Sequence, residues 1–309
     1  MMIERADFDD LVNQAMQMPG HQSMRPVIEK ELLHFDILFA LERERLLDEL
    51  VFQGGTSLRL CHGSSRFSEY LDFVGGPDFS SHSVSDIKTC IEHYVARRYQ
   101  LAVSVKQPSE LRADPYYAGI RVDKWQISVV TAPERRDLPK QRVKLEIANV
   151  PAYTREPHTL NANYPFLPDG YRDLLIITES LDEVMADKLI ALVNNEKYVR
   201  HRDIWDLQWL SQQGASPNIE LVKKKLIDYS VEGYTSKARR LQERLPDIIA
   251  GQPFRNEMRR FLPASVLERT LDQPKFTHFL IRETHALLGQ VVDTLDGQAS
   301  TGPEHDFTL

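Results

Sequence analysis

Residues 51–73 (VFQGGTSLRLCHGSSRFSEYLDF) combine a glycine turn with an acidic strand. The pair Gly54-Gly55 follows a short apolar run, and Asp72 lies between two apolar residues in a second strand-like run. Glycines let backbone N–H groups approach an anion closely, and a helix that begins there adds its dipole. The stretch therefore resembles a phosphate-binding turn opposite a metal-binding carboxylate. Gly-Gly turns are common and a single acid on a strand is usually solvated, so neither feature is sufficient alone.

A second carboxylate lies in the segment RVKLEIANV, which alternates as a half-buried strand does. Lys144 and Glu146 share its polar face. If this strand lies beside residues 71–74, Asp72 and Glu146 can face one divalent cation. Acids on adjacent strands suit a hard cation that keeps its own waters and binds substrate phosphates. The alternative is a cross-strand lysine–glutamate pair at the surface.

The densest basic cluster follows in ADKLIALVNNEKYVRHRDIWDLQWL. It contains Lys188 and the run Arg200–Arg202, and a lysine or arginine suits phosphate well. Asp203 and Asp206 are three residues apart on a predicted helix and share a face. On the residues alone, a salt-bridged helix pair is slightly favoured over a phosphate site.

Helices and strands alternate up to about residue 180, and the pattern is helical after that. This division predicts one domain at residues 1–180 and a second, helical domain at residues 181–309. Thr56-Ser57 is expected to cap a short helix after the glycine turn. Residues 150–172, rich in Pro, Asn and Tyr, are expected to be irregular. Further elements of the first domain are expected as helices at 6–17, 27–49 and 84–98, and as strands at 101–107, 117–131, 141–150 and 174–180.

Bulk properties restrict the function classes. The net charge of -7 argues against a wholly basic nucleic-acid coat, although a local basic patch remains compatible with it. The two cysteines form no CxxC pair, and the histidines have no metal-ligand spacing, so disulfide, thiol and zinc chemistry are disfavoured. A polar N-terminus and the lack of a long apolar stretch predict a cytoplasmic protein without a membrane span.

Three blocks of the chain together resemble the AbiEii/AbiGii-type nucleotidyltransferase family of abortive-infection, phage-defence and toxin–antitoxin systems. The blocks are GGTSLRLCHGSSRFSEYLDF, the strand VKLEI, and EVMADKLIALV followed by RHRDIWDL. The first matches the family's glycine turn and S-E-D-hydrophobic-D-F pattern. The third matches its A-D-K-L and R-D-x-x-D-L blocks. The matches run in the family's order from residue 51 to about residue 210, roughly half of the chain.

The resemblance implies an α/β nucleotidyltransferase fold, in which a short mixed sheet flanked by helices precedes an all-α C-terminal domain. It implies Mg²⁺-dependent transfer of a nucleotidyl group from a nucleoside triphosphate (NTP) to an acceptor, with tRNA as one candidate. The implied partner is an antitoxin, often one with a winged-helix part. The implied site residues are Gly54, Gly55, Thr56, Ser57 and Arg66 for the nucleotide, Asp72 and Glu146 for metal and catalysis, Lys188 for phosphate and catalysis, and Asp203 as a later catalytic acid.

One position departs from the family pattern. The family's first metal-binding acid falls at position 70, where this chain has Tyr70. Glu69 does not replace it, because neighbouring residues on a strand point to opposite faces. A phenol, with a pKa of about 10, is a poor magnesium ligand near neutral pH. Three interpretations stay open: a toxin impaired at position 70, a nucleotidyltransferase fold that only binds nucleotide or a partner protein, and weak catalysis by Asp72 and Glu146 alone.

Overall fold

The computed structural model describes residues 5–111, 120–135, 137, 139–195 and 197–299, and these residues form two compact units. The first unit extends to residue 180, and the second begins at residue 181. Residues 259–269 group with the first unit, although the sequence placed them in a continuous helical domain. The two-domain division itself stays a prediction.

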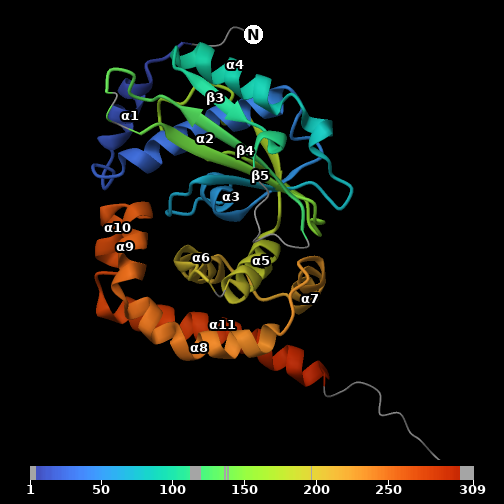
Figure 1. The fold of residues 1–309 in the computed structure, drawn as a ribbon. Helices are drawn as coiled ribbons and strands as arrows, with labels where there is room; N and C mark the ends of the chain where they lie inside the picture. The colour runs from blue at the N-terminus through green and yellow to red at the C-terminus, as the bar shows by residue number, and fades with distance from the viewer. Residues whose placement is uncertain (1–4, 112–119, 136, 138, 196, 300–309) are drawn as a thin grey trace, which may run out of the picture. The chain divides into compact units, whose positions relative to one another are not determined.

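The first unit is built on a seven-stranded mixed sheet with the strand order β3-β4-β5-β2-β1-β7-β6 (Figure 1). Strands β2 and β5 are parallel, as are β1 and β7, and the other neighbouring pairs are antiparallel. The strands are β1 (Val51–Gln53), β2 (Tyr70–Val74), β3 (Val103–Lys106), β4 (Val122–Val129), β5 (Gln141–Ala148), β6 (Glu156–Thr159) and β7 (Leu175–Thr178).

Helices α2 (Arg25–Arg43) and α4 (Ile87–Tyr99) cover one face of this sheet, where the core lies (Figure 1). The strands alternate, so that β2, β4 and β5 turn their apolar side chains toward this core. The short helices α1 (Phe8–Met16) and α3 (Gly54–Leu60) complete the unit, together with α10 (Ala264–Arg269). The buried set from the three strands comprises Leu71, Phe73, Trp125, Ile127, Val129, Val143, Leu145 and Ile147.

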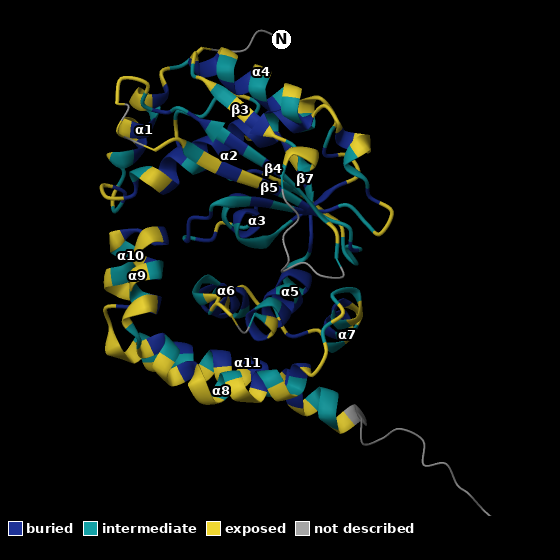
Figure 2. Ribbon diagram, in the orientation of Figure 1, coloured by how far each residue is buried: buried dark blue, intermediate teal, exposed yellow. Residues whose placement is uncertain are grey.

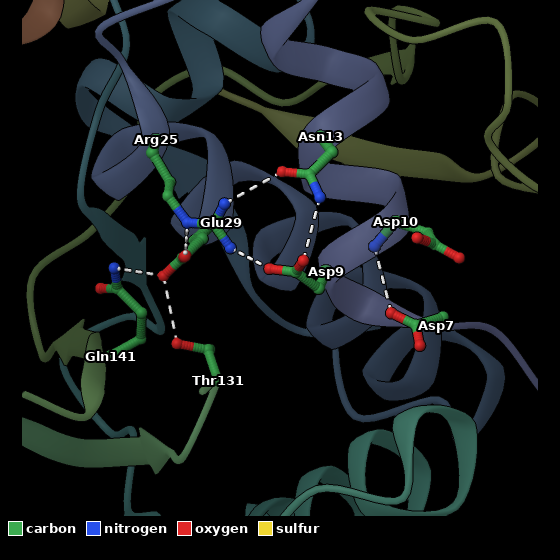
Figure 3. A network of polar contacts seen from close by, with 8 residues as sticks. All are labelled: Asp7, Asp9, Asp10, Asn13, Arg25, Glu29, Thr131 and Gln141. Atoms are coloured by element: carbon green, nitrogen blue, oxygen red, sulfur yellow. Dashed lines mark hydrogen bonds and ion pairs between the residues drawn. The ribbon is translucent and has the colours of Figure 1, made fainter. Parts of the chain in front are cut away.

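A polar network joins the start of α2 to α1 and to the sheet (Figure 3). Arg25 forms ion pairs with Asp9 of α1 and, at 2.9 Å, with Glu29 one turn along α2. The other oxygen of Glu29 accepts hydrogen bonds from Gln141 Nε2 at 2.8 Å and from Thr131 Oγ1 at 3.2 Å. The network fixes the register of α2 against β5, the strand that carries Glu146.

The second unit consists of helices joined by turns and irregular segments, with no strand among its described residues. Its helices are α5 (Leu181–Asn194), α6 (His201–Gln212), α7 (Ile219–Asp228), α8 (Tyr234–Ala250), most of α9 (Gln252–Phe261) and α11 (Pro274–Ala299). Helix α5 packs on α6, α7 and α8, and its residues are mostly buried (Figure 2). A mixed sheet flanked by helices and followed by helices confirms the predicted fold class. No helix among the described residues is both long and apolar enough to span a membrane.

The predicted helix at 27–49 ends early, at Arg43. Arg45 adopts a left-handed conformation, with φ of 58°. Its N–H donates to the carbonyl of Glu42, and the N–H of Leu46 donates to that of Leu41. This pair of bonds is a Schellman motif, whose left-handed position is usually glycine. The segment LERERLLDEL contains no glycine and so carries no recognisable stop signal.

Strand β6 lies inside residues 150–172, which were predicted to be irregular. It is four residues long, contains Pro157 and forms an edge of the sheet. Its residues are mostly exposed, so it has no apolar alternation to reveal it. The predicted strand at 117–131 is observed as Val122–Val129, and its first three positions lie outside the described residues.

Candidate functional site

Asp72 and Glu146 lie side by side on the parallel strands β2 and β5. Their Cα atoms are register partners, and Tyr70 and Lys144 are partners two residues earlier on each strand. Since apolar partners such as Leu71 and Leu145 face the core, the two carboxylates share the opposite face. The condition that the sequence left open, that these strands are neighbours, is therefore confirmed.

The glycine turn contacts this acid pair. Gly54 has a φ of +76°, which L-residues with a side chain rarely adopt. A Cβ atom at this position would lie 2.8 Å from Asp72 Oδ2. Gln53, the residue before it, is the register partner of Asp72 in the antiparallel pair β1–β2. The turn thus brings backbone against the carboxylate in a way that only glycine permits.

The predicted capping role of Thr56-Ser57 is wrong, because helix α3 already begins at Gly54 and its N-cap residue makes no side-chain cap. Both hydroxyls instead donate hydrogen bonds to backbone carbonyls. Thr56 Oγ1 donates to the carbonyl of Tyr70 on β2, and Ser57 Oγ donates to the carbonyl of Gly54 at 3.0 Å. Thr56 and Ser57 are 1% and 0% exposed, so their side chains support the turn. Any anion at this turn would meet backbone N–H groups.

Replacing Gly54 by alanine is expected to lower the free energy of unfolding by about 2–4 kcal/mol, from left-handed strain and the clash with Asp72. Gly76 provides the matched control, since its φ is +87° and a Cβ atom added there would meet nothing within 4 Å. Gly76→Ala should cost only the backbone strain, about 1 kcal/mol. Urea unfolding measures both, and equal losses would show that Gly54 does not press on the carboxylate.

Arg66, predicted to bind nucleotide, is 2% exposed. Its Nη1 donates to the carbonyl of Phe67 at 2.7 Å. A Cβ atom on Gly55 would overlap its Nη2 atom and would lie 3.0 Å from Ser68 Oγ. The guanidinium therefore packs beneath the glycine turn, and its role in binding nucleotide stays a prediction.

The acid pair has a cationic neighbour that the sequence did not identify. Lys124 of β4 is the register partner of Glu146, and its Nζ lies 3.6 Å from Glu146 Oε1. The alternative of a cross-strand lysine–glutamate pair is thus present, with Lys124 in place of Lys144. Lys144 instead lies over Tyr70, with Nζ 5.1 Å from the ring centroid. Period-two alternation indicated which face these residues occupy but not which strand supplies the partner.

Two carboxylates in register fit one hard cation. Mg²⁺ commonly keeps several waters and binds through one or two carboxylates plus substrate phosphates. Asp72 and Glu146 meet that requirement, and both are half-buried on the sheet face beside the glycine turn. Within the described ranges no group of three or more His, Cys, Asp or Glu residues could hold a metal. The donor set is consistent with one magnesium ion and lacks a third carboxylate at Tyr70.

Lys188 and Asp203 lie in the second unit, on α5 and α6. Lys188 Nζ is 3.0 Å from Asp203 Oδ1 and 2.6 Å from Asp206 Oδ2. All three side chains are buried, and Arg200 also pairs with Asp203. Burial alone would raise the pKa of Asp203, but the charges of Arg200 and Lys188 outweigh it and hold that pKa well below the ordinary value. The favoured alternative of a salt-bridged helix pair describes this arrangement.

A second buried lysine cluster was missed by the sequence reasoning. Lys225 of α7 is 1% exposed and lies 2.8 Å from Glu183 Oε1 and 2.7 Å from Asp187 Oδ2, both on α5. Lys225 lies on the same helix face as Leu221 and Val222. Its position on this apolar face was the feature of the sequence that could have indicated a buried lysine. The cluster fixes the rotation of α5, the helix that carries Lys188.

Comparisons with solved structures find proteins of similar fold. The chain is similar in fold to MenT4, a nucleotidyltransferase toxin from Mycobacterium tuberculosis H37Rv, with a TM-score of 0.57 and 17% identity over 97% of this chain and 96% of that one. JHP933 from Helicobacter pylori matches with a TM-score of 0.48 and 16% identity over 89% of this chain and 95% of that one. A comparison with curated proteins finds no match.

A family model gives the assignment. The model described as the AbiEii nucleotidyl transferase toxin of type IV toxin–antitoxin systems matches residues 36–282. The match covers most of the 309 residues and includes the glycine turn, the acid pair and the Lys188 cluster. The chain therefore belongs to the AbiEii nucleotidyltransferase toxin family.

Proposed function

We propose that this protein is a metal-dependent nucleotidyltransferase toxin that transfers a nucleotidyl group from an NTP to an acceptor such as tRNA, and that Tyr70 lowers its activity. The observation that carries the proposal is the in-register pair Asp72 and Glu146 on one sheet face, in contact with the glycine turn. Its place of action is the cytoplasm, within a toxin–antitoxin pair that serves phage defence. The partner is an antitoxin encoded beside it, for which a winged-helix protein is the candidate.

In this proposal the acid pair, the glycine turn and Lys124 of the first unit each have a distinct task. Asp72 and Glu146 hold Mg²⁺, which supplies charge stabilisation for the phosphates when bound. The backbone N–H groups of the Gly54–Ser57 turn bind phosphate oxygens. Lys124 restrains Glu146 through their ion pair. Lys188 as a phosphate ligand and Asp203 as a catalytic acid stay predictions from the family pattern.

A second candidate function is favoured by Tyr70. The phenol stands where the family has a metal-binding acid, and Lys144 lies over its ring. With one carboxylate fewer, the fold would bind a nucleotide or a partner protein and act by occupancy. This alternative predicts nucleotide binding without transfer.

The substitution Tyr70→Asp separates the two functions. It is expected to raise the transfer rate by about 10²–10³, the range for one well-placed electrostatic group. Transfer is measured as label passed from each α-labelled NTP to a tRNA pool, alongside growth inhibition on expression. Tyr70→Phe is the matched control, since it adds no acid and should bring no gain.

Three other outcomes are informative. Strong transfer by the Tyr70 form would contradict the requirement for an acid at position 70. No transfer by either form, with NTP binding intact, would favour the binding function. A gain with Tyr70→Phe equal to that with Tyr70→Asp would show that loss of the phenol hydroxyl, and not a new metal ligand, is responsible.

A further inference from the structure

One face of the first unit's sheet is polar along four adjacent strands, β3, β4, β5 and β2. Alternation turns most apolar residues of these strands toward α2 and α4, so the other side chains lie on the opposite, open face. We call this set the open face. It comprises the polar residues Tyr70, Asp72, Ser104, Lys106, Lys124, Gln126, Ser128, Arg142, Lys144 and Glu146, and the apolar register partners Val74, Ala148 and Val122 stand at one end of the same face.

The open face is cationic outside the acid pair. It carries four basic residues against two acidic ones, in a chain whose net charge is -7. Lys124 is paired with Glu146, whereas Lys106, Arg142 and Lys144 are exposed. Because both acids lie on β2 and β5, the positive charge extends from them toward β3. This separation of charge is not needed to pack a sheet, since polar uncharged residues would serve equally well.

The register places Lys106 and Lys144 in one row across the sheet, with the uncharged Gln126 between them, and Arg142 in the neighbouring row opposite Ser128. Lys106 pairs with Gln126, Gln126 with Lys144, and Lys144 with Tyr70. Three steps between neighbouring strands span about 14 Å. This length exceeds that of a triphosphate chain, which would occupy only the end near Lys144. A polymer with repeated negative charges would use the whole row.

Tyr70 ends the row beside Asp72, two residues away on the same strand face. Its ring is half-buried and has Lys144 Nζ 5.1 Å from its centroid. Proteins that bind single-stranded nucleic acids combine cations along the backbone with an aromatic ring for base stacking. Sheet faces that bear aromatic residues are used for this purpose in RNA-binding domains.

We propose that the open face binds a single-stranded polynucleotide, with Lys106, Arg142 and Lys144 on its phosphates and Tyr70 stacked on a base beside Asp72 and Glu146. RNA and DNA share this chemistry. The assignment of the strand as the acceptor rests on the proposed function, whereas the binding does not. The ring of Tyr70 then serves as a stacking surface, at a position where its phenol is a poor metal ligand.

Fluorescence anisotropy with labelled RNA and DNA oligonucleotides of about 15 nucleotides, without NTP, tests the proposal. The double variant Arg142→Gln with Lys144→Gln is expected to bind about tenfold more weakly and to reduce the salt slope by about 1.4. Lys106→Gln should weaken binding about threefold. The matched control is Lys88→Gln with Arg97→Gln on α4, which covers the opposite face of the sheet and should bind normally.

The aromatic contribution is tested separately. Tyr70→Leu is expected to weaken oligonucleotide binding about tenfold, while Tyr70→Phe keeps the ring and should bind within about twofold. Thermal melting of each variant verifies folding, since the replaced cations are exposed. Comparison of the RNA and DNA arms identifies which polynucleotide the face prefers.

Several results would overturn the proposal. They are no oligonucleotide binding by the unmodified protein, equal loss in the α4 control, and a loss of NTP affinity in the Arg142–Lys144 variant with oligonucleotide affinity unchanged. Binding without nucleotidyl transfer would leave the open-face proposal intact and refute the proposed function. Transfer with normal kinetics in the Arg142–Lys144 variant would leave the proposed function intact and refute the open-face proposal.

Discussion

Replacing Asp72 by asparagine is expected to reduce nucleotidyl transfer by about 10²–10³, measured in the Tyr70→Asp background where transfer is strongest. Asparagine keeps the shape of the side chain and the contact with Gly54 but removes the negative charge. Glu146→Gln should act similarly, because its carboxylate is the register partner across β2 and β5. Together the two losses should be less than additive, since both act on one cation.

The control for this pair is Asp173→Asn, a change at an exposed acid of the same unit outside the acid pair. Its transfer rate should match that of the parent. Circular dichroism should show all three variants folded, because neither exchange alters side-chain volume. Retention of transfer by Asp72→Asn would remove the acid pair from the mechanism, even if the protein proves to be an active transferase.

Replacing Lys225 by methionine is expected to lower the free energy of unfolding by about 3–5 kcal/mol. Methionine fills the volume of the lysine but removes its cation from two carboxylates, the buried Glu183 and the half-buried Asp187. An uncompensated buried charge is costly, whereas the intact ion cluster contributes little over an apolar one. Urea unfolding of the protein, followed by circular dichroism, measures the loss.

Lys224→Met is the matched control, because Lys224 is the exposed neighbour on the same helix. It should change stability by less than about 0.5 kcal/mol. A triple variant that also replaces Glu183 and Asp187 by leucine should regain most of the loss, since it removes the two carboxylates that lost the Lys225 cation. If Lys225→Met is as stable as Lys224→Met, the cluster does not hold α5 and α7 together.

Strand faces were predictable from the sequence, and strand neighbours were not. Alternation in VKLEI places Glu146 on a polar face without long-range information. Its pairing with Asp72 joins strands separated by helix α4 and two other strands, which local patterns do not encode. The role of Lys124 was missed for the same reason, because its position opposite Glu146 depends on the pairing of β4 with β5.

Local exceptions account for the other differences. The end of α2 depends on Arg45 in a conformation that usually requires glycine, so the sequence indicated a longer helix. Strand β6 contains a proline and exposed residues, which argue against a strand. Lys188 was recognised as chemically significant, yet only the structure shows that Asp203 and Asp206 both pair with it in a buried position.

The most direct test of nucleotidyl transfer compares α-labelled with γ-labelled NTP, using the Tyr70→Asp variant and an RNA pool with Mg²⁺. Nucleotidyl transfer predicts that the α label enters the acceptor, that the γ label leaves as pyrophosphate, and that Asp72→Asn lowers both by about 10²–10³. Entry of the γ label would indicate phosphoryl transfer and contradict the account. So would a complete lack of α-label transfer with every NTP in a variant that still binds NTP and still binds oligonucleotide measurably.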